Sequence, residues 1–163
     1  MAATPIAAVS RYWPVGTTKW YWLTSVASYL SPGPTRLELN AGTDISGEVA
    51  DISGFTVSSN QIDTPDVNSR FRSKIPGPIE AEDSTLTLYA DPSGVDARAL
   101  FPRDTTGFVV RLDGGDTAGR KMSVFPCKVA SQNKLMGTEE EAGRIEVAFT
   151  ITGIPAEDLA VPA

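Results

Sequence analysis

The sequence predicts a mainly β fold: an antiparallel β-sandwich or partly closed barrel with one or two short flanking helices. Several short segments alternate apolar and polar residues with the two-residue period of an extended strand. Turn-forming clusters of glycine, proline, asparagine and aspartate recur about every ten residues, which is the spacing of an all-β domain. Only two segments carry a helix-starting pattern, and each is too short to be stable as an isolated helix.

Length and composition indicate one globular domain of 163 residues, of which 41% are hydrophobic. We divide the chain into an N-terminal arm (residues 1–17), a β domain (residues 18–155) and a C-terminal tail (residues 156–163). The net charge of −6 argues against a protein that mainly grips phosphate backbones, because that task requires a basic surplus. The single cysteine, Cys127, excludes an internal disulfide. No stretch approaches the roughly 18 apolar residues of a membrane span, so we expect no membrane insertion.

The chain begins with an arm in which Pro5, Pro14 and Gly16 interrupt every candidate period. Residues 19–27 follow as the first predicted strand, and this strand is apolar on both faces. Two explanations stay open. The strand lies in the centre of the core, or its second face is covered by another subunit.

Two short helices are predicted beside the sheet. Thr35 and Glu38 have the spacing of a capping box, which predicts a helix of one or two turns over residues 36–41. A second helix is predicted over residues 93–101, with Ser93 as its N-cap. Both helices need to dock against the sheet, because neither is long enough to persist alone.

Three predicted strands, over residues 48–57, 67–75 and 84–90, dominate the middle of the chain. Residues 58–66 are expected to form a polar connector between the first two, and the Pro-Gly-Pro sequence at 76–78 is expected to end the second. One face of the second strand carries a basic row. It consists of Arg70, Arg72 and Lys74. Such a row blunts an exposed sheet edge or meets acidic residues of a partner.

The last third of the chain is again β-rich. Strands are predicted over residues 107–112 and 121–129, and Pro126 indicates a bulge or an edge position in the latter. A polar loop is expected over residues 132–143. Residues 145–152 have the plainest alternation of the whole chain and form the last predicted strand.

The residues that usually carry chemistry are scarce. The chain has no histidine, which removes the commonest general base and the commonest transition-metal ligand. One cysteine cannot build a structural zinc site. Neighbouring carboxylates, such as Glu80, Glu82 and Asp83, lack the spacing of a calcium loop and are interpreted as solvated loop charge. We therefore expect no catalytic residues, no cofactor and no metal.

The order and spacing of several segments carry a family resemblance. They are residues 34–44 (PTRLELNAGTD), 49–55 (VADISGF), 64–66 (TPD), 77–91 (GPIEAEDSTLTLYAD) and 122–126 (MSVFP), followed by the final strand. In this succession the chain resembles the major tail protein, or tail tube protein, of long-tailed bacteriophages. The resemblance extends over most of the chain from about Lys19 and leaves the first eighteen residues outside it.

The resemblance implies a structural virion protein. Six copies would form a ring, and rings would stack into a hollow tail tube around a tape-measure protein, with tail terminator and baseplate proteins at its ends. DNA would later pass through this tube, which is assembled in the cytoplasm of the bacterial host. Six times the chain's net charge of −6 is −36, so we expect a net negative lumen that does not retain DNA. Arg70, Arg72 and Lys74 are expected to lie away from the DNA.

The connector over residues 58–66 is the candidate inter-ring contact, because an isolated hydrophobe stands there among polar residues. Its candidate residues are Asn60, Gln61, Ile62, Asp63, Thr64 and Asp66. We expect this loop to be disordered in the monomer and to fold against the next ring, with Ile62 in an apolar pocket and the acidic residues near basic groups such as the Arg70 row. The alternative is an ordinary surface loop. Both chain termini are also expected to be mobile in a free subunit.

A second function class remains open from the sequence. A monomeric β-sandwich binding module, for example for carbohydrate, would use Trp13, Trp20 or Trp22 as a stacking platform. Such a module stays monomeric at high concentration, whereas a tube protein forms rings or rods.

Overall fold

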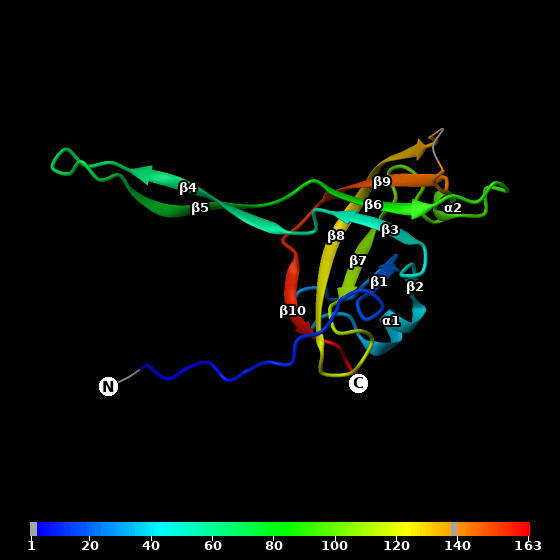
Figure 1. Ribbon diagram of the computed structural model, residues 1–163, viewed down its shortest axis with the longest axis horizontal. Coiled ribbons are helices and arrows are strands. Elements are labelled where there is room, and N and C mark those ends of the chain that lie inside the picture. Colours follow the sequence, from blue (N-terminus) through cyan, green and yellow to red (C-terminus); the bar gives the residue numbers. More distant parts are fainter. Residues whose placement is uncertain (1–2, 138–139) are drawn as a thin grey trace.

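The computed structural model describes residues 3–137 and 140–163, in which ten strands and two short helices occur (Figure 1). The helices are α1 (Arg36–Ala41) and α2 (Ala97–Leu100). The strands are β1 (Lys19–Leu23), β2 (Thr43–Asp44), β3 (Val49–Ser53), β4 (Val57–Thr64), β5 (Ser73–Ala81), β6 (Ser84–Tyr89), β7 (Thr106–Leu112), β8 (Lys121–Leu135), β9 (Arg144–Ile151) and β10 (Ala156–Ala160). Every strand pair is antiparallel, which confirms the predicted mainly β class.

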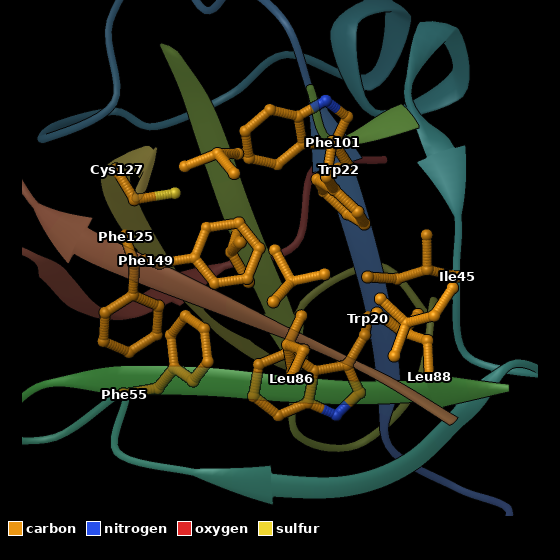
Figure 2. Packing of buried hydrophobic residues seen from close by; sticks show 14 residues of the cluster. Trp20, Trp22, Ile45, Phe55, Leu86, Leu88, Phe101, Phe125, Cys127 and Phe149 are labelled. Atoms are coloured by element: carbon orange, nitrogen blue, oxygen red, sulfur yellow. The ribbon is translucent and has the colours of Figure 1, made fainter. Parts of the chain in front are cut away.

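Eight of these strands form one curled sheet in the order β2-β1-β7-β8-β9-β6-β3, with β10 added along β8. The sheet does not close into a barrel within the described residues. Instead, its β1 and β3 ends meet across the larger hydrophobic core. The rings of Trp20, on β1, and Phe55, just after β3, pack edge to face with their centroids 5.3 Å apart. Figure 2 shows these rings together with Phe125 and Phe149 in one aromatic cluster.

A second hydrophobic core fills the other face of the sheet. Its buried members are Leu23, Leu39, Val110, Leu112, Met122, Val124, Ala156 and Val161. Leu39 comes from α1, so this helix covers the face of β1 that is turned away from the larger core. Of the two explanations for the doubly apolar first strand, the central core strand is therefore confirmed, because the chain itself covers both faces.

The first predicted helix has the predicted cap. The Glu38 carboxylate accepts the Thr35 backbone N–H at 2.7 Å, and the Glu38 N–H donates to the Thr35 hydroxyl at 3.3 Å, which completes a capping box. Glu38 also accepts the backbone N–H of Ala27 at 2.6 Å and so ties down the preceding loop. These hydrogen bonds favour the charged carboxylate and so lower the pKa of Glu38. The bond from the Thr35 backbone N–H has the largest effect, followed by that from Ala27.

The second predicted helix is present but starts later than predicted. Asp96, not Ser93, is the N-cap, and its carboxylate accepts the Arg98 backbone N–H at 3.0 Å. Ser93 instead donates its backbone N–H to Asp91 in the preceding turn. Gly94 explains the difference, because its φ of 82° is left-handed and cannot continue a right-handed helix.

Pro126 lies where β8 changes its partner. On one edge, β8 pairs with β10 up to Val124 and with β9 from Cys127 onward. A proline, which has no N–H to donate, is tolerated at such a gap between two ladders. Alternate side chains along this part of β8 face the two different cores, which explains why both phases of the predicted strand are apolar.

The predicted polar loop over residues 132–143 is wrong in its first part. Strand β8 continues to Leu135, and residues 131–135 pair with residues 144–148 of β9. Because the side chains of this extension are mostly polar and exposed, no hydrophobic alternation marks it in the sequence. Residues 138–139 of the predicted loop lie outside the described residues.

The C-terminal residues also have regular structure. A mobile tail is predicted over residues 156–163, yet residues 156–160 form β10 along β8. Ala156 and Val161 are buried in the second core, which gives this short strand its anchors. A run of five residues with few large hydrophobes is too short to show a strand period in the sequence.

Candidate assembly surface

The most distinctive surface feature is a long hairpin, residues 57–81, that projects from the body of the molecule (Figure 1). Strands β4 and β5 pair only with each other, in a two-stranded sheet separate from the main one. The register runs from Val57 opposite Ala81 to Thr64 opposite Ser73. A two-stranded hairpin is marginally stable by itself in water, so this geometry favours contact with another surface.

This region differs from the sequence prediction. The predicted connector over residues 58–66 is mostly strand β4, and the predicted strand over residues 67–75 is largely the hairpin tip, residues 65–72. The Pro-Gly-Pro sequence at 76–78 does not end the strand but lies inside β5. A register shift between Ser59 and Gln61 accommodates it.

Gly77 is required at this irregularity. A Cβ atom there would lie 2.6 Å from the Asn60 carbonyl oxygen and 2.9 Å from the Ile62 side chain. The flanking prolines are tolerated because β5 has a partner on one side only among the described residues.

The base of the hairpin is locked into the larger core. Gly54 and Phe55 have φ values of 76° and 54°, so the chain turns sharply as it leaves β3. The Phe55 ring is buried, and its backbone N–H donates to the buried Ser84 hydroxyl at 2.9 Å. Ser84 in turn donates to the carbonyl oxygen of Glu82, one residue beyond the end of β5. The hairpin therefore leaves the body at a fixed base.

The candidate inter-ring residues lie on the hairpin as an ordered strand rather than a disordered loop. Asn60, Gln61, Ile62, Asp63 and Thr64 belong to β4, and Asp66 accepts the Asn68 backbone N–H at 2.9 Å in the tip. Ile62 is not an isolated hydrophobe, because it lies directly across from Ile75. Both side chains are about half exposed, at 47% and 50%.

The structure brings the basic row and one candidate acidic residue together. The Asp63 carboxylate lies 3.8 Å from the Arg72 guanidinium and 3.6 Å from the Lys74 ammonium, within the same hairpin. All three side chains are at least 44% exposed, so these pairs contribute little to stability. Arg70 lies in the tip, next to Phe71, whose side chain is 76% exposed.

The N-terminal arm is a second segment with exposed hydrophobes. Residues 3–13 have no regular structure and extend away from the body (Figure 1). The exposed apolar side chains of the arm are Ile6, Val9, Tyr12, Trp13 and Val15. The arm and the hairpin each expose several large apolar side chains, and a gathering of such side chains is typical of a protein–protein interface.

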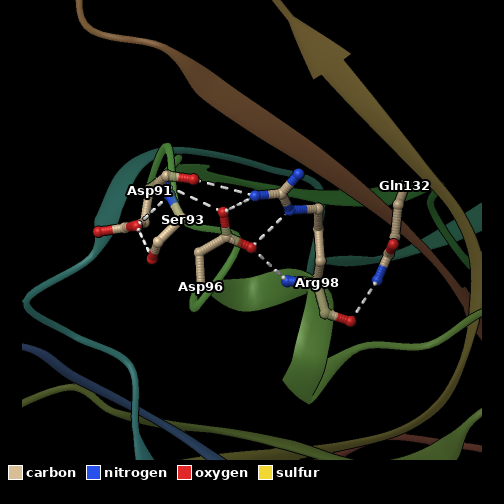
Figure 3. Close-up of polar contacts among 5 residues, drawn as sticks. All are labelled: Asp91, Ser93, Asp96, Arg98 and Gln132. Carbon is tan, nitrogen blue, oxygen red and sulfur yellow. Dashed lines mark hydrogen bonds and ion pairs between the residues drawn. The ribbon is translucent and has the colours of Figure 1, made fainter.

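A groove of about 590 Å³ lies beside α2, between the ends of β2 and β6. Figure 3 shows the polar contacts that hold one wall of it. The Arg98 guanidinium donates to both oxygens of Asp96, at 2.7 and 2.6 Å, and these bonds hold the pKa of Asp96 far below its usual range. Gln132 on β8 donates to the carbonyl oxygens of Arg98 and Phe101 and joins the helix to the sheet.

The titratable side chains of the described residues bear on whether the chain holds a metal ion. Among them, no group of three or more histidine, cysteine, aspartate or glutamate side chains could hold a metal ion. Burial raises the pKa of the Cys127 thiol to about 12, so this residue packs in the core as a protonated thiol. No helix in the described part of the chain is long and apolar enough to cross a membrane.

Several solved structures resemble this chain in fold. A chain from the sheath/tube terminator of an extracellular contractile injection system, PVC, in its extended state has a TM-score of 0.61 at 14% identity, with 91% of this chain and 99% of that chain covered. A chain from the PVC sheath–tube complex gives 0.59 at 14% identity, covering 91% and 94%. A chain from the tube-terminating cap of the anti-feeding prophage gives 0.58 at 14% identity, covering 97% and 96%. At such identities the likeness shows the fold alone.

The family of the chain follows from a comparison of its sequence with known protein families. No curated protein matches the chain. Residues 7–163, by contrast, match the family described as phage tail tube protein, and the matched region includes the whole sheet, the projecting hairpin and the groove. The chain therefore belongs to the phage tail tube protein family.

Proposed function

We propose that this protein polymerises as stacked hexameric rings into the hollow tube of a phage tail, through which DNA passes. The observation that carries the proposal is the family match over residues 7–163. The role is structural and not enzymatic, and the protein acts in the tail of a virion that is assembled in the bacterial host cytoplasm.

The distribution of exposed hydrophobes supports self-assembly. The hairpin and the arm hold large apolar side chains away from the core, where only another molecule can bury them. A head-to-tail contact between copies closes into a ring when its rotation is a whole fraction of a turn. On assembly, the described part of the arm, residues 3–17, packs against a neighbouring subunit.

The charge of the chain supports passage of DNA without binding. A six-membered ring carries six times −6, or −36, and a lumen with a share of that charge repels DNA. We place Arg70, Arg72 and Lys74 at a subunit contact or on the outside, because a basic bore would retain DNA. Further partners are a tape-measure protein in the lumen, and terminator and baseplate proteins at the tube ends.

The burial of two candidate tryptophans argues against the alternative function as a carbohydrate-binding module. Trp20 and Trp22 are only 6% and 1% exposed and pack inside the larger core. Trp13 is 74% exposed but lies on the arm, in a segment without regular structure. One tryptophan without a supporting surface does not form the flat stacking face that such a module needs.

Negative-stain electron microscopy of the concentrated protein tests the proposal. We expect rings with six-fold symmetry, or rods built from them. Sedimentation velocity over a concentration series should show a monomer giving way to much larger species. A protein that stays monomeric across the whole series, without rods, would contradict the proposed function.

A further inference from the structure

We propose that the hairpin tip of one copy inserts into the groove beside α2 of a neighbouring copy. The contact rests on the proposed self-assembly and assigns a specific pair of surfaces to it. Its two halves are the tip, residues 65–72, and the groove described above.

The tip combines apolar and basic side chains. Val67 and Phe71 are both exposed, although neither touches the core. Arg70 and Arg72 stand between and beside them. Asp66 is the carboxylate within the tip, and Asp63 on β4 lies 3.8 Å from Arg72, so Arg70 is the tip's main basic group for a neighbouring copy. Although the chain as a whole is acidic, the tip is therefore positively charged and partly hydrophobic, and it stands at the end of a hairpin whose base is fixed.

The groove has the complementary character. Its floor is formed by buried hydrophobes, namely Ile45, Leu88 and Phe101. Among the described residues, its charged lining groups are all carboxylates: Asp44, Glu48, Asp91 and Asp96. Arg98 neutralises Asp96, and Lys19 lies 3.9 Å from Asp44, which leaves Glu48 and Asp91 exposed at the rim. A basic tip with an apolar side chain fits such a site in both charge and polarity.

The occupant has to come from a second copy. The hairpin tip and α2 lie at opposite ends of the longest axis of the molecule, and the hairpin points away from its own groove (Figure 1). Strand β4 has 8 residues, so at about 3.3 Å per residue the hairpin reaches roughly 26 Å beyond its base. Tip and groove at opposite ends form a head-to-tail contact, which is the type of contact that generates rings and tubes.

Trans cross-linking tests the contact directly. Separate variants Asn68→Cys, in the tip, and Val95→Cys, at the groove, are mixed and oxidised. Cys127 is buried and does not compete. We expect a disulfide-linked dimer from the mixture and not from either variant alone. Thr117→Cys, in the exposed turn between β7 and β8, replaces Val95→Cys as a matched control and should give no dimer.

A charge exchange gives the second readout. Arg70→Glu should raise the protein concentration needed for assembly about tenfold, the effect of losing about 1.4 kcal/mol of contact energy. Glu48→Lys in the same chain should restore most of this loss, because each contact then joins a negative tip to a positive rim. Circular dichroism of the monomer checks that both variants fold.

Three results would overturn the inference. The first is assembly of Arg70→Glu at the wild-type protein concentration. The second is that adding Glu48→Lys to Arg70→Glu does not lower the concentration needed for assembly. The third is a disulfide between Val95→Cys and Ala8→Cys, in the N-terminal arm, in place of one between Val95→Cys and Asn68→Cys. If rings and rods still form in these experiments, the proposed function stands and only the tip-in-groove contact fails. If the wild type forms neither, the proposed function fails first.

Discussion

The backbone N–H of Phe55 donates to the Ser84 hydroxyl over 2.9 Å, at the point where the chain leaves the main sheet for the hairpin. Both groups are buried, and the Ser84 hydroxyl donates in turn to the carbonyl oxygen of Glu82, one residue beyond the end of the returning strand β5. One side chain therefore joins the outgoing and returning ends of the hairpin to the core. These two hydrogen bonds fix the base of the hairpin relative to the body. An assembly contact at the tip requires such a fixed base.

Ser84→Ala should destabilise the fold, because it leaves the buried Phe55 N–H without a partner. An unsatisfied buried donor costs about 1–3 kcal/mol. Denaturant unfolding measures the loss, and hydrogen exchange should show faster exchange at the hairpin base. Ser53→Ala, on an exposed serine of β3, is the matched control. Equal stability of the two variants would show that these hydrogen bonds do not hold the hairpin.

Asp96→Asn should destabilise the protein near neutral pH, because the Asp96 side chain is 4% exposed and binds the Arg98 guanidinium. Removing one partner of such a pair costs about 3–5 kcal/mol when it is fully buried, and less here because Arg98 is 27% exposed. The folded pKa of Asp96 lies below its unfolded value of about 3.9. The wild-type advantage is therefore complete above that value and is lost as the pH falls through the folded pKa.

The measurement for Asp96 is the free energy of unfolding of wild type and variant as a function of pH. The difference should shrink as the pH falls below about 4. Asp51→Asn, on an exposed carboxylate of β3, controls for loss of one negative charge. A difference that stays constant from neutral to acidic pH would contradict the assignment.

Gly107→Ala should be poorly tolerated on β7. A Cβ there would lie 2.5 and 2.6 Å from two ring carbons of Trp22 and 2.7 Å from the Leu23 carbonyl oxygen. Relieving such a clash in a packed core costs about 1–3 kcal/mol. Gly47→Ala, where a Cβ would meet open space, should change the unfolding midpoint little. Similar midpoints for the two variants would mean that the Trp22 ring moves freely.

The parts of the fold that were predicted correctly carry local signals. Strand β9 alternates because one face enters the core, and α1 begins at a complete capping box. The hairpin gives no such signal. The side chains of residues 58–76 are exposed on both of its faces, so no alternation marks β4, and the prolines of β5 resemble a strand end.

The candidate site was predicted only in outline for the same reason. Asp63 and the basic residues Arg72 and Lys74 were each identified, but their proximity depends on the pairing of β4 with β5. The groove beside α2 was not predicted at all. It is assembled from β2, the end of β6 and the α2 loop, which are far apart in the sequence, and no spacing rule connects them.

Replacing residues 60–78 with an Asn-Gly turn should leave a folded, soluble monomer that cannot assemble. Ser59 and Ile79 already face each other across the hairpin, so a two-residue turn closes it without strain. The replaced residues contribute no buried side chain, so the free energy of unfolding should change little. Negative-stain microscopy and sedimentation then compare this variant with wild type and with Thr117→Ala, a change in an exposed turn. If the shortened protein still forms long tubes at the wild-type rate, stacking is carried by the N-terminal arm or by residues 132–143 instead.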